Sequence, residues 1–202
     1  QNYILPTQAS RNLTSVFAEF RGNRFHTGID FSTQNREGFP CYAIADGEIS
    51  RIYVNAYGYG KAIYLRLNNG RTAVYAHLSE FPAEIDTYVR AAQFKSTTYS
   101  QNLFPKQGQF KFKQGDTIAF TGSTGIGDPH LHFELRDSAD TCLNPILYLP
   151  PLNDETFPQI TSLYAFGVSG AIINDSLPFT QVSLKKINDT VYQALPIKVH
   201  QK

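Results

Sequence analysis

The sequence lacks the features that would place the chain on a nucleic acid or across a membrane. Its 18 basic and 17 acidic residues leave a net charge of +1, and the basic residues are scattered, so a nucleic-acid or membrane-surface partner has no support. No apolar run approaches the roughly 20 residues that a transmembrane helix needs. Internal repeats and low-complexity tracts are also missing. With 42% hydrophobic residues, the 202-residue chain can fold into one domain of ordinary size and a further small unit.

Cysteine is scarce, and the chain does not begin with methionine. Cys41 and Cys142 allow one disulfide bond, but two buried free thiols fit equally well. Neither belongs to a C-x-x-C pair, which argues against a thiol-based zinc or redox site. Because Gln1 opens the chain without an apolar leader, we expect either a mature exported chain after signal removal or a trimmed one.

Frequent turn signals and short alternating runs predict a mainly β fold, with an antiparallel β-sheet domain. The strongest hairpin signal is Asn-Asn-Gly at 68–70, between β-rich runs at 61–67 and 71–77. Residues 1–25 are expected to be irregular. Further strands are predicted at 42–44, 48–54, 116–120 and 130–136.

Asn-Pro and Pro-Pro pairs between 144 and 151 mark a boundary. We expect one domain at 1–152. Residues 153–202, with β-like runs at 160–168, 180–187 and 190–199, would form a small C-terminal β subdomain or the start of a truncated module.

One segment of the first domain departs from the β pattern. After Pro82, the apolar residues Ile85, Tyr88, Val89 and Ala92 follow helical spacing. We therefore expect an insertion at about 81–109, made of a short helix and then a loop from 96 to 109. It would be either surface decoration or a wall of the binding groove.

The histidines carry the strongest chemical signal. Residues 130–135 (HLHFEL) alternate as a strand, so His130 and His132 share one face and the apolar residues the other. His26 stands four residues before Asp30, and His77 closes the run AVYAH. Imidazoles in such apolar settings are costly unless they are ligated or hydrogen-bonded.

Neutral imidazole and carboxylate together suit zinc, and three protein ligands with one open position are typical of a catalytic site. His26, Asp30 and one histidine of the 130/132 pair would supply those ligands. Zinc would lower the pKa of a bound water to roughly 7. Since no H-E-x-x-H helix supplies a glutamate base, the remaining histidines are the natural candidates for proton transfer. The glycine-rich stretch 122–127 lacks the ending of a P-loop and is interpreted as a turn that lets substrate backbone approach.

Four motifs in order, HTGID at 26–30, YAHLS at 75–79, GSTG at 122–125 and HLHFE at 130–134, resemble the LytM/lysostaphin-type zinc endopeptidases over about residues 20–150. The resemblance implies one zinc ion per chain, held by His26, Asp30 and His132. His77 and His130 would then act as catalytic residues beside the bound water and the scissile carbonyl. We expect Glu134 to support the site or lie at the surface, and Arg24 to orient Asp30 or face water. Candidate substrate-binding residues are Tyr57, Tyr59, Ser123 and Thr124.

The implied function is hydrolysis of peptide bonds in bacterial peptidoglycan cross-links, in an exported protein of the periplasm or cell envelope. The alternative is a non-catalytic module of the same fold that binds the wall or activates other wall hydrolases. The complete set of ligands and auxiliary histidines favours the enzyme. A third alternative is an active peptidase held latent by an inhibitory segment, for which Asn2, Asn12 and Asn23 are available.

Overall fold

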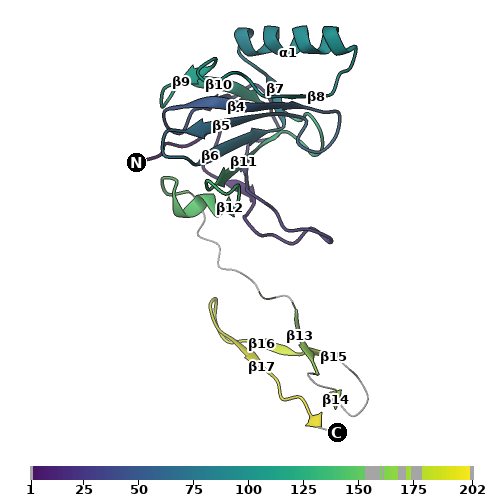
Figure 1. Ribbon diagram of the computed structural model, residues 1–202. Coiled ribbons are helices and arrows are strands. Elements are labelled where there is room, and N and C mark those ends of the chain that lie inside the picture. The colour runs from purple at the N-terminus through teal and green to yellow at the C-terminus, as the bar shows by residue number, and fades with distance from the viewer. Residues whose placement is uncertain (1, 153–159, 161, 168–171, 174–178, 201–202) are drawn as a thin grey trace. The chain divides into compact units, whose positions relative to one another are not determined.

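The computed structural model describes residues 2–152, 160, 162–167, 172–173 and 179–200 (Figure 1). It divides the chain into two compact units, Gln1–Asp154 and Glu155–Lys202. All four histidines of the family-like motifs lie in the first unit.

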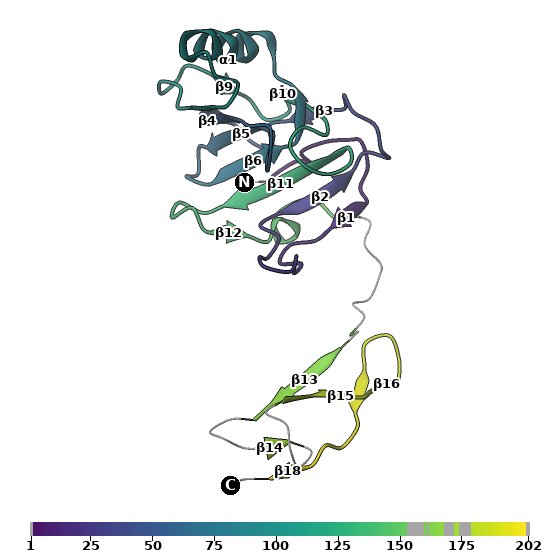
Figure 2. The same ribbon diagram turned by 90° about the vertical axis from the view of Figure 1, so that its right-hand side faces the viewer.

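A nine-stranded antiparallel sheet forms the body of the first unit (Figures 1 and 2). Gly70 has a φ of 85° in the turn between two of its strands, which confirms the predicted hairpin. Two short strands lie off the main path: β12 (Cys142–Leu143) pairs with β11, and β9 (Lys111–Phe112) pairs with β4. In spatial order the main strands are β1 (Leu13–Ser15), β2 (Ile29–Ser32), β11 (His130–Arg136), β6 (Thr72–Ala76), β5 (Lys61–Leu67), β4 (Gly47–Val54) and β8 (Gln101–Leu103).

A second sheet covers one face of the first. It contains β3 (Pro40–Tyr42), β10 (Thr117–Thr121) and β7 (Leu78–Glu80) in the order β3-β10-β7. Residues of both sheets share one buried apolar cluster. The alternation of β11 decides which side chains join it: Leu131, Phe133 and Leu135 are fully buried in this core, whereas the two histidines of the strand lie on the other face.

The insertion begins with α1 (Ala83–Ser96), which confirms the predicted helix. Ile85 and Val89 are its buried residues and join the main core. Both views place α1 at the β4–β8 edge of the large sheet, away from β1 and β2. The expectation of an unstructured loop after the helix is wrong, because β8 pairs with Ile52–Val54 of β4. Its polar sequence, Gln-Asn-Leu, has no strand pattern, and the free edge of β4 supplies its hydrogen bonds.

The irregular N-terminal segment also differs from the expectation. It contains β1, which pairs with β2, and a small hairpin at 16–26 closed by a bridge between Phe20 and Phe25. Near the end of the unit, a single 3-10 turn (Pro145–Leu147) follows Asn144, whose side chain accepts a hydrogen bond from the Ile146 amide at 3.2 Å.

The second unit contains three two-stranded antiparallel pairs in its described part. Val182 is buried there, and the rings of Phe166 and Phe179 stack at 5.6 Å. A small β segment at the C-terminal end is thus confirmed as part of the fold. The pairs are β13 (Leu163–Phe166) with β15 (Phe179–Val182), β14 (Ile172–Ile173) with β18 (Val199–His200), and β16 (Leu184–Lys186) with β17 (Tyr192–Ala194).

Candidate metal centre and active site

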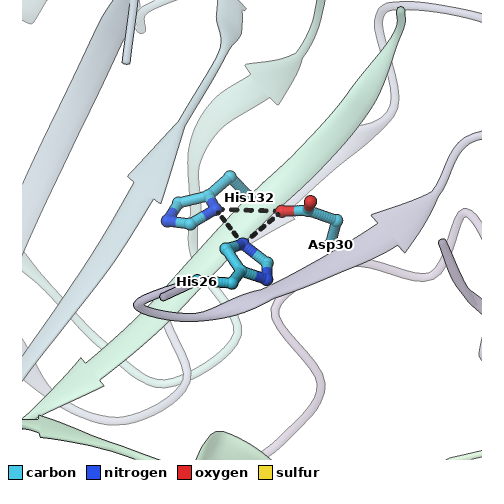
Figure 3. A group of neighbouring side chains, drawn as sticks. All are labelled: His26, Asp30 and His132. Carbon is cyan, nitrogen blue, oxygen red and sulfur yellow. Dashed lines mark hydrogen bonds and ion pairs between the residues drawn. The ribbon is translucent and has the colours of Figure 1, made fainter. Parts of the chain in front are cut away.

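Three buried side chains meet where β2 and β11 pair. The register places His132 opposite Asp30, and His26 enters from the loop just before β2. Asp30 Oδ1 lies 2.9 Å from His132 Nδ1 and 3.1 Å from His26 Nε2, and these two nitrogens are 3.0 Å apart (Figure 3). The atoms form a group that could hold a metal ion. Two strands and one loop therefore bring together residues that are more than 100 positions apart in the chain.

The hydrogen bonds of the two imidazoles show which nitrogens face the centre of this group. His26 Nδ1 lies 2.8 Å from the Val16 carbonyl, and His132 Nε2 lies 2.8 Å from a carboxylate oxygen of Glu134. A carbonyl or carboxylate can only accept, so these nitrogens carry the hydrogens in the neutral rings. The opposite nitrogens then present lone pairs to one another and to Asp30, an arrangement that needs a shared cation.

Zinc fits this donor set. It takes imidazole nitrogen and carboxylate oxygen at about 2.0–2.2 Å in a tetrahedral arrangement, so its ligand atoms lie a little over 3 Å apart. The separations of 2.9–3.1 Å among His26, Asp30 and His132 come close to that value. Each imidazole is also held by an acceptor on its far nitrogen, as zinc ligands in proteins usually are.

The charges of the group support the same conclusion. Burial alone would raise the pKa of Asp30, but its contacts with His132 and His26 hold it well below its usual range. Burial would lower the pKa of His132, whereas Asp30 and Glu134 raise it above its ordinary value. Without metal the carboxylate is therefore ionised and the imidazole next to it favours a proton, so zinc and protons compete for this site.

Glu134 is fully buried next to His132, which excludes the surface alternative for this residue. Its Oε1 accepts hydrogen bonds from His132, from Thr27 at 2.5 Å and from the Tyr59 hydroxyl. Its Oε2 accepts from Arg136 Nε at 2.7 Å and Nη2 at 2.6 Å. Burial alone would raise the pKa of Glu134, but His132 and Arg136 lower it to about 2. The carboxylate thus orients the His132 ring as a charged acceptor.

His77 and His130 lie beside the group of His26, Asp30 and His132. Their ring centroids lie 4.5 Å apart, and the His77 ring is 5.8 Å from that of His132. His130 Nδ1 donates to the Asp128 carbonyl at 2.6 Å, and its Nε2 lies 3.7 Å from Asp30 Oδ1. The His130 ring therefore directs its free nitrogen toward the centre from a position next to it.

His77 is held in an unusual backbone conformation between β6 and β7, with a φ of 60°. Its amide donates to the Tyr59 carbonyl at 2.9 Å, and its Nδ1 donates to the Thr124 carbonyl at 2.9 Å. Nε2 is left without a proton. Burial lowers the pKa of His77 to about 4, so the ring is neutral at neutral pH. A neutral imidazole with a free Nε2 can accept a proton from a reacting group.

The glycine-rich turn at 122–127 packs on the chain's own backbone at Gly125, whereas Ile126 and Gly127 line the cavity, so the approach of substrate backbone to this turn stays a prediction. A Cβ on Gly125 would lie 2.2 Å from the Gly58 carbonyl oxygen, and one on Gly60 would lie 2.2 Å from Thr124. The two glycine-containing loops pack directly on each other. This packing places the Thr124 carbonyl where it binds His77.

Three of the four candidate substrate-binding residues lie away from the cavity over the metal ligands. Tyr57 is 78% exposed, Ser123 donates to Glu37, and the Thr124 hydroxyl bonds Leu78 and Lys61 within the loops. Only Tyr59 lines the cavity, and its ring stacks on His132 at 5.3 Å. Substrate binding by Tyr57, Ser123 and Thr124 therefore stays a prediction that the cavity lining does not support.

The cavity itself has a volume of about 1020 Å³ and extends from His26, Asp30 and His132 across the face of the large sheet. Its lining includes four residues that the sequence did not single out: Arg21, Arg51, Tyr53 and Tyr64. In the described part of the chain, none of the lining residues comes from 81–109, which favours surface decoration over a wall of the groove. None of Asn2, Asn12 and Asn23 lines it either.

The arginine that contacts and orients Asp30 is Arg21 and not Arg24, which the sequence had suggested. Arg21 Nη2 lies 2.7 Å from Asp30 Oδ2, the carboxylate oxygen turned away from the histidines. Arg24 lies exposed on the same hairpin. Both residues line the cavity, but sequence spacing could not tell them apart because the hairpin at 16–26 decides which one reaches Asp30.

The two cysteines were expected to be either paired or free. Cys41 is buried and Cys142 partly buried, and both of these described residues are free thiols. Within the described residues, no helix has the length and apolar character to cross a membrane.

Comparison with known proteins agrees with this geometry. Residues 24–103 match the family described as Peptidase family M23. The DD-carboxypeptidase/endopeptidase Mpg of Neisseria meningitidis is 34% identical over 134 residues, which are 66% of this chain and 25% of that protein. The murein hydrolase activator NlpD of Salmonella typhimurium is 28% identical over 123 residues, which are 61% of this chain and 26% of that protein.

Among solved structures, Helicobacter pylori Csd3 matches 74% of this chain and 33% of its own, with 29% identity and a TM-score of 0.53. The chain spans about a quarter of the length of the curated relatives that it matches. The matched region contains His26, Asp30, His77 and the strands β2, β4, β5 and β6, and β11 with His130 and His132 follows it in the chain. The chain belongs to peptidase family M23.

Proposed function

We propose that this chain is a zinc-dependent endopeptidase that hydrolyses peptide bonds in bacterial peptidoglycan. The observation that carries the proposal is the convergence of three lone-pair donors, His26 Nε2, Asp30 Oδ1 and His132 Nδ1, within one buried group. The family and the name of the relative Mpg support a peptidase. Because peptidoglycan lies outside the cytoplasm, the proposal also requires that the protein is exported.

The three converging residues would hold the zinc ion. When bound, zinc would act as a Lewis acid on a peptide carbonyl and make water acidic enough to ionise near neutral pH. Tyr59 packs against the His132 ring, and Glu134 and Arg21 fix the orientation of His132 and Asp30. These contacts keep the ligand atoms in place as substrate enters and leaves.

His77 and His130 would move protons and bind the oxyanion that forms during hydrolysis. His77 carries its hydrogen on Nδ1, which is bonded to Thr124, so Nε2 is free to take a proton and later return it to the leaving amine. His130 is 16% exposed and faces the same cavity, so its Nε2 can reach substrate. The pair provides two imidazoles at 4.5 Å without a glutamate base.

A second candidate function is that of a non-catalytic module that activates other wall hydrolases. The name of the relative NlpD favours it, since that protein is described as a murein hydrolase activator. The complete ligand set and the two flanking histidines of this chain support the enzyme instead.

The test is digestion of purified peptidoglycan, with the released fragments identified by mass. We expect cleavage that disappears on chelation and returns with zinc. His132→Ala should lose both zinc and cleavage, whereas His200→Ala, which removes a histidine from the other unit, should keep both. Binding of about one zinc per chain without any cleavage of peptidoglycan would contradict the proposal and favour the activator.

A further inference from the structure

The cavity continues from the metal ligands across three strands to a second polar position. On the face opposite the core, His132 of β11 pairs with Ala76 of β6. In the next row, Glu134 lies in line with Val74, Tyr64 and Arg51 across three further strands. Neighbouring strands lie about 4.8 Å apart, so β4 stands about 14 Å from β11. Arg51 lines the same cavity as the ligands. It therefore lies at the far end of the groove.

The guanidinium of Arg51 is fixed in place by its neighbours. Its Nε donates to Asn102 Oδ1 at 2.7 Å, and its central carbon lies 4.7 Å from the ring centroid of Tyr64 and 5.3 Å from that of Tyr53. Phe104 lies on it at 5.9 Å. Aromatic rings bind a guanidinium through their faces and leave its edge free for hydrogen bonds. Little conformational freedom would be lost when an anion binds here.

The two terminal nitrogens of Arg51 are also free to donate hydrogen bonds. Among the described residues, Nη1 and Nη2 of Arg51 have no hydrogen-bond or ion-pair partner. The other arginines of the groove differ. Arg136 is bonded to Glu134 and Asp140, and Arg21 is bonded to Asp30. Arg24 is exposed and has no ring beneath it in the described part of the chain. Among the described arginines that line the groove, Arg51 is thus the one stacked guanidinium with a free pair of terminal donors.

We propose that Arg51 binds a carboxylate of the peptide substrate, four to five residues from the bond that is cut. The distance follows from the strand spacing, since an extended peptide rises about 3.3 Å per residue and the groove runs about 14 Å from β11 to β4. Two parallel N–H donors match the two oxygens of a carboxylate and do not match an uncharged amide in the same place. This inference rests on the proposed function and adds a requirement for a free carboxylate at one position.

The proposal also gives the insertion at 81–109 a role in the groove, although none of its described residues lines the groove. Asn102 belongs to β8 and Phe104 follows it, and both hold the Arg51 side chain from outside the cavity. The insertion acts on substrate through this arginine, as a positioning segment.

The experiment compares two peptides that differ only in whether that carboxylate is free or amidated. Binding to the zinc-free protein is measured first, by titration, and kcat/KM with zinc second. We expect wild type to prefer the free carboxylate by about 10- to 100-fold in both measurements, since a charge-assisted pair of hydrogen bonds is lost in the amide. Arg51→Gln should lose this preference, and Asn102→Ala should reduce it.

Arg24→Gln is the matched control, because it removes the same charge from the cavity without removing a stacked, partner-free guanidinium. It should keep the preference. Equal binding of both peptides by wild type would overturn the inference, and so would an equal loss in Arg24→Gln, which would indicate general attraction only. Carboxylate-dependent binding without any cleavage would contradict the proposed function and leave this inference standing.

Discussion

Glu134→Gln tests whether the buried carboxylate under His132 holds the metal site together. The side chain keeps its size, but one of its two acceptor oxygens becomes a donor. If the amide oxygen replaces Oε1, its NH₂ group faces the donors of Arg136. If it replaces Oε2, the NH₂ group faces His132, which must then move its hydrogen to Nδ1 and lose the lone pair that points at Asp30. Each arrangement leaves buried groups mismatched.

The magnitude follows from these contacts. Loss of an outer partner of a metal ligand typically lowers metal affinity 10- to 100-fold, which is about 1.4–2.7 kcal/mol. Removal of one partner of a buried ion pair lowers the free energy of unfolding by about 3–5 kcal/mol. Arg136 keeps its contact with Asp140, so we expect the lower end, about 3 kcal/mol. For a unit of this size that lowers Tm by about 6–12 °C.

Zinc affinity is measured by competition with a chromogenic chelator, and stability by thermal unfolding of the zinc-free protein. Asp140→Asn is the matched control, because it removes a carboxylate from the same arginine at a site where the side chain is 73% exposed. Exposed ion pairs contribute little, so this variant should resemble wild type. If Glu134→Gln binds zinc as tightly as Asp140→Asn and unfolds at the same temperature, Glu134 does not hold the His132 ring, and the reasoning is refuted.

Three further predictions concern His77 and the loops that hold it. His77→Ala should bind zinc like wild type and lose most of its turnover on peptidoglycan; equal loss of zinc would show that the separation of ligands from proton-transfer groups is wrong. In zinc-free protein, the His77 imidazole should titrate near pH 4 by NMR and stay neutral above that pH, because its folded pKa is depressed to about 4; a midpoint at or above 6.5 would contradict the role of burial. Gly125→Ala adds a Cβ at a φ of 88° and 2.2 Å from the Gly58 oxygen, so chemical denaturation should show a larger loss of stability than for Gly70→Ala, which has a similar φ of 85° and open space around it; equal losses would show that loop packing does not matter here.

The residues of the candidate metal site were predictable because their information is local. His26 and Asp30 lie in one short motif, and the alternation of residues 130–135 fixes which side chains leave the core face. The helix at α1 was predictable for the same reason, since Ile85 and Val89 repeat at helical spacing. The ligand choice between His130 and His132 came only from the resemblance, because both side chains share a face.

Contacts between distant segments were not predictable. Arg21 reaches Asp30 only because the hairpin at 16–26 folds back, and β8 becomes a strand only because β4 has a free edge. The glycine-rich stretch at 122–127 indicated a close backbone approach, but the sequence does not say that Gly125 approaches the loop of Gly58 and Gly60. Arg51 stands in an ordinary alternating strand, and its neighbour Asn102 lies 51 residues away.

The pairing of β8 and β9 with β4 has a consequence for folding that is separate from catalysis. β4 is the longest strand of the large sheet, and these two short strands cover its outer side at Ile52–Val54 and Gly47–Glu48. A long strand with an open outer side is a template for pairing with another molecule. The insertion at 81–109 contributes β8, and through this strand it also protects Ile52–Val54 of β4 from edge-to-edge aggregation. A chain that lacks 81–109 would expose the outer side of β4 at Ile52–Val54. We therefore expect a lower yield of soluble protein from it, besides any change in cleavage preference.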